Sequence, residues 1–131
     1  MLKLVLKRKL LYLLTAEELF KLLSTTREND IEYKSHFLKR LTDRAEICDI
    51  IPKDLKEFKK ILLNNFPVYI DYQENNELKD ENEYKVFYNI NEKYDIVVVL
   101  ALICSNPVKI KFITVYPFHT KRRLKLYEQK F

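Results

Sequence analysis

The stretch YDIVVVLALI, residues Tyr94–Ile103, decides the fold of this chain. After Asp95 it contains only apolar residues, and many of them are β-branched. A continuous apolar run of this length is typical of a β-strand that is buried on both faces. Such a strand has neighbours on both sides, so we expect Tyr94–Ile103 to lie inside a β-sheet.

Alternating segments on either side of this strand supply its neighbours. Val68–Tyr72 and Tyr84–Ile90 precede it, and Val108–Tyr116 follows it. Over most of their length apolar and polar side chains alternate, which is the period of a half-buried strand. The connecting segments are short enough for hairpins, so we expect the four strands to pair in an antiparallel manner. Pro117 has no backbone N–H and is predicted to end the last strand.

The residues before these strands predict helices. Thr15–Glu18 is a capping-box sequence, so a helix is expected to begin there. A second helix is expected over residues 35–46, with Ser35 as its cap. Pro52 suits the first turn of a third helix. The apolar face of that third helix consists of Leu55, Phe58, Ile61 and Leu62.

Together these segments predict an α+β domain in which N-terminal helices are followed by a four-stranded antiparallel β-sheet. Residues 2–7 also alternate and predict a short strand ahead of the helices, with a helix as the alternative. With 131 residues, 47% of them hydrophobic, the chain has the size of one domain with one core.

The charge of the chain favours an anionic partner such as nucleic acid. The formal net charge is +5 and the pI is near 9.1. Residues 108–131 contain seven Lys or Arg residues and a single Glu, whereas residues 71–95 contain eight acids and three lysines. The basic C-terminal segment is therefore where we expect an anion to bind, and the acidic segment is expected to be solvated loop charge.

Several function classes are excluded by composition. The chain has no glycine, which excludes the P-loop, the dinucleotide-binding fingerprint and the EF-hand loop. Cys48 and Cys104 lack the spacing of zinc ligands, so we expect no metal, no cofactor, and two small buried thiols in a reducing cytoplasm. The apolar run Leu10–Leu14 is too short for a signal peptide, and no segment reaches the length of a membrane span, so no membrane partner is expected.

The first candidate site lies in SHFLKRLTDR, residues Ser35–Arg44. In a helix, His36, Arg40 and Arg44 form one stripe, because residues four apart are neighbours. The start of a helix favours a bound anion and an uncharged imidazole. His36 can then act as a general base beside a phosphate that the two arginines hold. The alternative is a surface helix in which both arginines pair with nearby acids, namely Asp43, Glu46 and Asp49.

The second candidate site follows the last predicted strand. Tyr116 is suited to stack on a base or to donate a proton, and His119 is suited to be the complementary acid. We expect this segment and the His36 helix to form two halves of one phosphodiester site. The alternative is that Tyr116 packs in the core and that the basic residues are a solvated tail. The expected nucleic-acid-binding residues are Lys109, Lys111, Thr114, Lys121, Arg122 and Arg123.

A rival motif uses carboxylates. Asp71 followed by Glu83 and Lys85 has the Asp…Glu-x-Lys pattern of Mg²⁺-dependent nucleases, in which the carboxylates bind the metal and the lysine orients water. An acid-rich segment also produces this pattern by chance, as at Glu77–Lys79. Those nucleases usually place a helix after the motif, whereas Tyr94–Ile103 is predicted to be a strand. We therefore rank this motif below the His36 site.

Residues 36–44, HFLKRLTDR, resemble the helical His-x3-Arg-x3-Arg signature of the barnase/colicin/RelE-like group of small metal-independent ribonucleases. Lys111–Pro117 resembles the last strand of these proteins. The resemblance covers residues 31–116 and implies two helices followed by a four-stranded antiparallel sheet. It divides the single domain, 1–131, into an N-terminal extension (1–30), a core (31–116) and a basic tail (117–131).

The resemblance also implies a function. It implies a toxin-like endoribonuclease that cleaves RNA by attack of the 2′-hydroxyl and leaves a 2′,3′-cyclic phosphate. Its catalytic residues would be His36, Arg40 and Arg44, with Tyr116 or His119 on the acid side. RNA is the expected partner, and many members are held by an antitoxin protein. The alternative on the same fold is a non-catalytic module that binds RNA or a protein partner.

Overall fold

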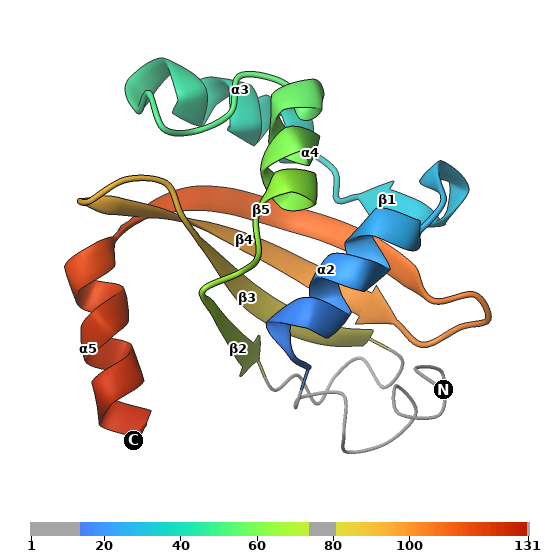
Figure 1. Ribbon diagram of the computed structural model, residues 1–131. Coiled ribbons are helices and arrows are strands. Elements are labelled where there is room, and N and C mark those ends of the chain that lie inside the picture. The colour runs from blue at the N-terminus through green and yellow to red at the C-terminus, as the bar shows by residue number, and fades with distance from the viewer. Residues whose placement is uncertain (1–13, 74–80, 131) are drawn as a thin grey trace.

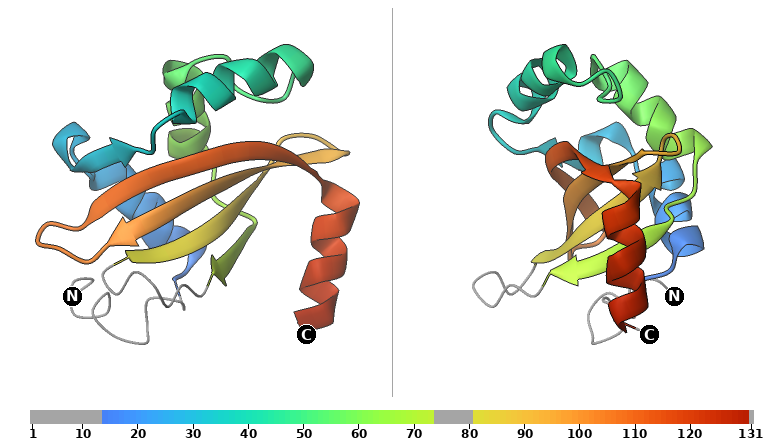
Figure 2. Two further views of the ribbon diagram at one scale, coloured as in Figure 1. Left: turned by 180° about the vertical axis from the view of Figure 1, so that it is seen from behind. Right: turned by 90° about the vertical axis from the view of Figure 1, so that its left-hand side faces the viewer.

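The computed structural model describes residues 14–73 and 81–130 of the chain. It shows a twisted β-sheet with three helices, α2, α3 and α4, packed against one face, and a fourth helix, α5, that leaves the end of the sheet (Figure 1). Seen from behind and from the side, α5 points away from α3 and α4 (Figure 2). The strand predicted over residues 2–7 lies outside the described residues.

The sheet contains five strands in the order β1-β5-β4-β3-β2. Their bounds are Ile31–Tyr33 for β1, Tyr69–Gln73 for β2, Glu81–Asn89 for β3, Tyr94–Ile103 for β4 and Lys109–His119 for β5. The strand predicted at Tyr94–Ile103 is confirmed as β4, and its residues 95–102 are buried. It lies between β3 and β5, and it is antiparallel to both.

The α+β class is confirmed, but the predicted four-stranded antiparallel sheet is wrong. β2 to β5 are antiparallel to one another, whereas β1 pairs in parallel with β5 and makes the sheet mixed. β1 was missed because three residues are too few to show a strand period. The helices are not all N-terminal either, because α5 (Thr120–Lys130) follows the sheet within the predicted basic tail.

The predicted end of the last strand is also wrong, because Pro117 lies inside β5 opposite Ile96. The pairing with β1 stops at Phe112, so the second half of β5 has a neighbour on one side only. A proline is tolerated in such an edge segment, where its missing N–H breaks no ladder hydrogen bond. The strand therefore continues to His119.

The helices begin where capping side chains allow it. α2 (Ala16–Thr25) has the predicted capping box, in which Thr15 and Glu18 each accept from the other's backbone N–H. α4 (Leu55–Asn64) does not begin near Pro52, because Asp54 caps it by accepting from the backbone N–H of Glu57. A short 3-10 turn, η2 (Glu28–Asp30), and α3 (Phe37–Ile47) complete the helical elements in the described part of the chain.

Two apolar clusters fill the two faces of the sheet. The larger cluster lies between the helices and the sheet and contains an aromatic group around Phe112, whose ring centroid is 5.1 Å from that of Phe58 and 6.1 Å from that of Phe37. The smaller cluster lies on the opposite face and is built on Phe87, with Val97 and Val99. Partly buried side chains packed against it are Tyr69, Ile113, Tyr116 and Phe118.

A buried carboxylate fastens α5 to the sheet. Asp95 in β4 has no exposed surface and accepts hydrogen bonds from Asn89 Nδ2 and Thr120 Oγ1, each at 3.0 Å. Arg123 of α5 forms an ion pair with the same carboxylate. Because all these donors converge on one buried acid, α5 starts in a fixed position beside the turn between β3 and β4. Within the described part of the chain, no helix is long and apolar enough to cross a membrane.

Candidate functional site

His36 occupies an unusual position at the start of α3. It is the N-cap residue of the helix, in place of the predicted Ser35, and its backbone is left-handed, with φ 72° and ψ 2°. It is the one non-glycine residue with positive φ in the described ranges. Histidine tolerates this region better than most residues, but the conformation still carries strain. The side chain does not cap the helix, and the residue is exposed.

Contacts on both sides of His36 impose this backbone. Lys34 N donates to the carbonyl of Phe112 at 2.9 Å, which ends β1 against β5. Phe37 N then donates to Lys34 O at 2.9 Å, and the Phe37 ring is buried against the aromatic group. The chain must turn within this short span to start α3, so His36 is held outward between two anchored residues.

The two arginines of the predicted stripe have different environments. Arg40 is exposed, and its backbone N–H donates to His36 O at 2.9 Å, as expected one helical turn on. Arg44 is half-buried and reaches across to β5, where its Nη1 donates to Thr114 Oγ1 at 2.8 Å and to the carbonyl of Val115. This contact places the last turn of α3 beside β5 at Thr114 and Val115.

The contact of Arg44 provides a hydrogen-bond donor to the part of β5 that β1 does not cover. β1 covers β5 only as far as Phe112, so carbonyls beyond it need other donors. Arg44 donates a hydrogen bond to the carbonyl of Val115. Close to this carbonyl the pairing of β5 with β4 shifts in register, because Val99 pairs with Thr114 whereas Leu100 pairs with Phe112. Neither Arg40 nor Arg44 forms an ion pair with the acids at 43, 46 or 49, all of which lie in the described part.

The residues of the second predicted site separate into different environments. Tyr116 is half-buried and faces Val97, so it packs in the smaller cluster on the face opposite α3. His119 is exposed at the end of β5, with its ring centroid 5.0 Å from that of Tyr94. Arg123 is paired with Asp95 and is a structural residue.

A cationic hollow surrounds His119. Lys121 and Arg122 line it together with Glu92 and Lys93 from the turn between β3 and β4, and its volume is about 360 Å³. The guanidinium of Arg122 also lies 4.9 Å from the ring centroid of Phe118. Three cations and an imidazole around one hollow suit a phosphate group.

The lysines on β5 contribute less free charge than predicted. Lys111 Nζ lies 2.9 Å from Glu81 Oε1, and the two side chains are 24% and 20% exposed. Lys109 is half-buried and faces Ile103 across the sheet. The positive stripe predicted along β5 is thus partly neutralised by Glu81 of β3, the strand on the far side of β4.

The structure does not bring the two histidines together. His36 lies next to the Lys34–Phe112 contact, and His119 follows Phe112 by seven positions along β5. At about 3.3 Å per residue, these positions are roughly 23 Å apart along the strand. One phosphate group therefore cannot contact both side chains, and the two candidate sites are separate.

The rival carboxylate motif shows no metal site. The strand register places Asp71 opposite Lys85 and Gln73 opposite Glu83, and Asp71 accepts from Gln73 Nε2 at 3.1 Å. β3 is followed by another strand. Among the residues that the structure describes, no group of three or more His, Cys, Asp or Glu side chains is arranged to hold a metal ion.

The cysteines differ slightly from the prediction. Cys48 is a free thiol and is half-buried, not fully buried as expected. Cys104 is also half-buried and accepts a hydrogen bond from Asn82 Nδ2 at 3.6 Å.

Sequence reasoning missed Glu92 and Lys93, which line the hollow, and the role of Asp95. The first two were hidden in a segment treated as solvated charge. Asp95 carried a usable signal, since a carboxylate beside a buried apolar run needs a buried partner. No sequence pattern near Asp95 identified that partner as Arg123, which follows 28 residues later.

The fold is that of a small α+β protein, with exposed His36 and Arg40 at the start of α3 and a separate cationic hollow around His119 at the end of β5. The model of the MJ0788 family matches residues 17–100, which is more than half of the chain, so the protein belongs to the MJ0788 family. The matched region contains His36, Arg40 and Arg44 and ends before Thr114. No curated protein and no solved structure matches the chain.

Proposed function

We propose that this protein is a toxin-like, metal-independent endoribonuclease that binds RNA along α3 and the end of β5. One observation carries the proposal: an exposed imidazole, His36, is held by a strained backbone at the start of a helix, one turn before the exposed Arg40. Strained backbone at an exposed polar residue often marks a functional position. The order of two helices, α3 and α4, and then four consecutive antiparallel strands agrees with the ribonuclease resemblance over this region, with β1 as an addition.

The proposed reaction uses few protein groups. The imidazole of His36 accepts the proton of a 2′-hydroxyl, and that oxygen attacks the adjacent phosphorus. The bond from phosphorus to the 5′ oxygen breaks, which leaves a 2′,3′-cyclic phosphate. Arg40 binds the phosphate and offsets its developing charge. Arg44 acts as a positioning residue, because it fixes α3 on β5 through Thr114.

The distance between the two candidate sites limits which group can protonate the leaving 5′ oxygen. Tyr116 packs on the opposite face, and His119 lies too far away to protonate the oxygen that leaves the phosphate beside His36. Solvent water supplies that proton at this exposed position. The hollow around His119 then binds another part of the same RNA, and about seven stacked nucleotides, at about 3.4 Å each, span the distance.

A second candidate function is a non-catalytic RNA-binding module. The observation that favours it is the use of Arg44 in the fold, which leaves one exposed arginine beside His36. Both functions place the protein in the cytoplasm with RNA as its partner, and an antitoxin protein is the further partner proposed for the toxin-like function.

The two functions are separated by incubating end-labelled single-stranded RNA with the full chain in EDTA. The ribonuclease is expected to give fragments that end in a 2′,3′-cyclic phosphate, and Arg40→Ala is expected to slow this cleavage by about 10²-fold or more. Lys56→Ala, which removes an exposed cation from α4, is the matched control and is expected to cleave normally. Salt-sensitive binding with intact RNA would support the binding module instead.

A further inference from the structure

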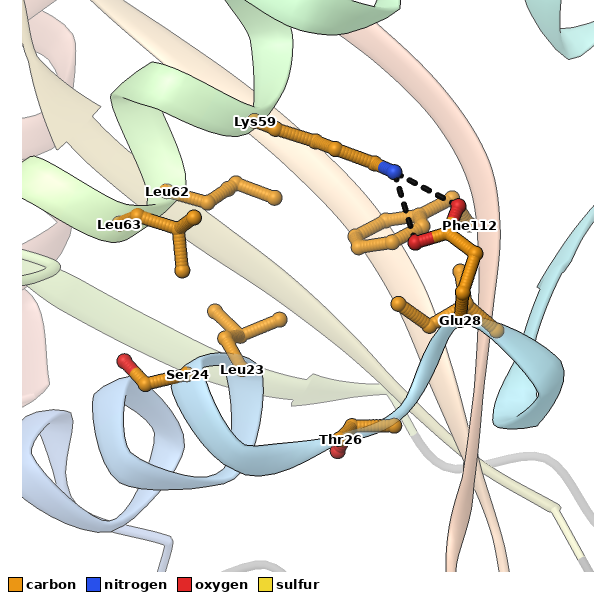
Figure 3. Close-up of a pocket in the computed structure, with 9 residues that line it drawn as sticks. Leu23, Ser24, Thr26, Glu28, Lys59, Leu62, Leu63 and Phe112 are labelled. Atoms are coloured by element: carbon orange, nitrogen blue, oxygen red, sulfur yellow. Dashed lines mark hydrogen bonds and ion pairs between the residues drawn. The ribbon is translucent and has the colours of Figure 1, made fainter.

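A separate cavity lies between α2, α4 and β5, and no residue of either candidate phosphate site lines it. Its volume is about 140 Å³. Apolar side chains form most of its wall, while hydroxyls and one ion pair lie at its rim (Figure 3). The apolar wall consists of Leu23, Ile31, Leu62, Leu63 and Phe112.

The ion pair at the rim joins α4 to the short turn η2. Lys59 Nζ lies 2.6 Å from Glu28 Oε1 and 2.8 Å from Oε2. The Lys59 side chain is 32% exposed and extends from α4, whereas the Glu28 side chain is 67% exposed on the short turn η2. Figure 3 shows the two charged ends meeting beside Phe112.

The cation of this pair is kept charged by its surroundings. The hydrogen bond that Lys59 donates to Glu28 raises the pKa of Lys59 above its ordinary value. Tyr33 lies next to the same amine, and burial raises the pKa of its phenol, so the phenol stays neutral at physiological pH. The cavity therefore presents an apolar wall and a fixed positive charge that is covered by a displaceable carboxylate.

We propose that this cavity binds a small carboxylate with an apolar body about the size of a benzene ring, and that the ligand replaces Glu28 on Lys59. A cavity of roughly 150 Å³ with Leu, Ile and Phe walls holds benzene, which sets the size of the body. An exposed ion pair contributes only about 0 to 1 kcal/mol, so Glu28 can be displaced at little cost. A cationic ligand is disfavoured, since it would have to expel the less exposed Lys59 from α4.

Benzoate is the probe, with benzylamine and benzyl alcohol as comparison ligands of the same shape. Each is titrated into the ¹⁵N-labelled full chain, and amide shifts are followed by NMR. Benzoate is expected to shift the amides of Leu23, Leu62 and Leu63 and to bind more tightly than either comparison ligand. Equal or tighter binding of benzylamine, or no shift at these amides, would overturn the proposal.

Three variants test the role of the charges. Glu28→Gln removes the competing carboxylate and is expected to tighten benzoate binding by up to about fivefold. Lys59→Met removes the cation and is expected to weaken it by about tenfold or more. Lys60→Met is the matched control, because Lys60 is an exposed lysine on α4 that does not line the cavity.

Circular dichroism spectra establish that each variant is folded. Unchanged affinity in folded Lys59→Met would show that the charge is not used. Weaker benzoate binding in Glu28→Gln would show that the Glu28 carboxylate favours ligand binding and does not compete with the ligand for Lys59. If Lys59→Met fails to fold, the comparison of benzoate with benzylamine on the wild-type chain still decides the question.

Discussion

Replacing His36 by glycine separates the backbone role of this residue from its chemical role. A left-handed backbone costs an ordinary residue about 1 to 2 kcal/mol, and glycine avoids this cost. Glycine loses about 0.5 to 1 kcal/mol through the greater freedom of the unfolded chain. At φ 72° the two effects leave His36→Gly equal to the wild type or more stable by about 1 kcal/mol. His36→Ala keeps the strain without the tolerance of histidine, so it is expected to be about 1 kcal/mol less stable than His36→Gly.

The measurement is chemical denaturation of the wild type and both variants, combined with RNA cleavage in EDTA. A difference of about 1 kcal/mol changes the ratio of folded to unfolded protein about fivefold. Both variants lack the imidazole, so both are expected to lose cleavage although His36→Gly is the more stable. Loss of activity with retained stability cannot be explained by unfolding.

Two results would refute this reasoning separately. If His36→Ala were at least as stable as His36→Gly, the left-handed backbone would not be a source of strain. If His36→Gly cleaved RNA at the wild-type rate, the imidazole would not be the general base. The first result concerns the fold at the start of α3, and the second concerns only the proposed chemistry.

The remaining predictions concern the anchors and the RNA surface. Asp95→Asn leaves Arg123 without its buried partner and is expected to lower the free energy of unfolding by about 3 to 5 kcal/mol, measured by urea denaturation; a loss under about 1 kcal/mol would contradict the anchor. Arg44→Lys keeps the charge but not the planar guanidinium, whose Nη1 donates to both Thr114 and Val115, so a loss of about 1 to 2 kcal/mol is expected in the same assay, and an unchanged midpoint would count against it. The slope of log RNA affinity against log salt concentration reports how many counterions binding releases, and Lys121→Ala is expected to reduce that number by about one. An unchanged slope would show that the hollow around His119 does not bind RNA.

The sequence predicted those elements that carry a long local signal. The apolar run of β4 and the capping box of α2 are both local patterns, and both were found at the right residues. β1 has three residues and owes its position to pairing with β5, so no local pattern identified it. The same pairing ends at Phe112 and makes the rest of β5 an edge, which explains why Pro117 does not end the strand.

The candidate site was predictable as a stripe on a helix but not as an arrangement in space. The helical spacing of His36, Arg40 and Arg44 follows from sequence alone. The position of that helix along β5 depends on contacts between residues about 70 positions apart, such as Arg44 with Thr114. Sequence spacing contains no information on this contact, so the separation of His36 from His119 could not be foreseen.

The contacts of α3 also bear on the proposed phosphate site at its start. The helix is fastened to β5 near both ends: by Lys34 on Phe112 before it starts, and by Arg44 on Thr114 in its last turn. Arg40 lies between these fixed points and has an exposed side chain. The contacts on either side hold Arg40 in position, so its guanidinium N–H groups are not needed for the fold. They remain available to donate hydrogen bonds to a phosphate. The third residue of the signature therefore serves the first two, because Arg44 holds the surface on which His36 and Arg40 are presented.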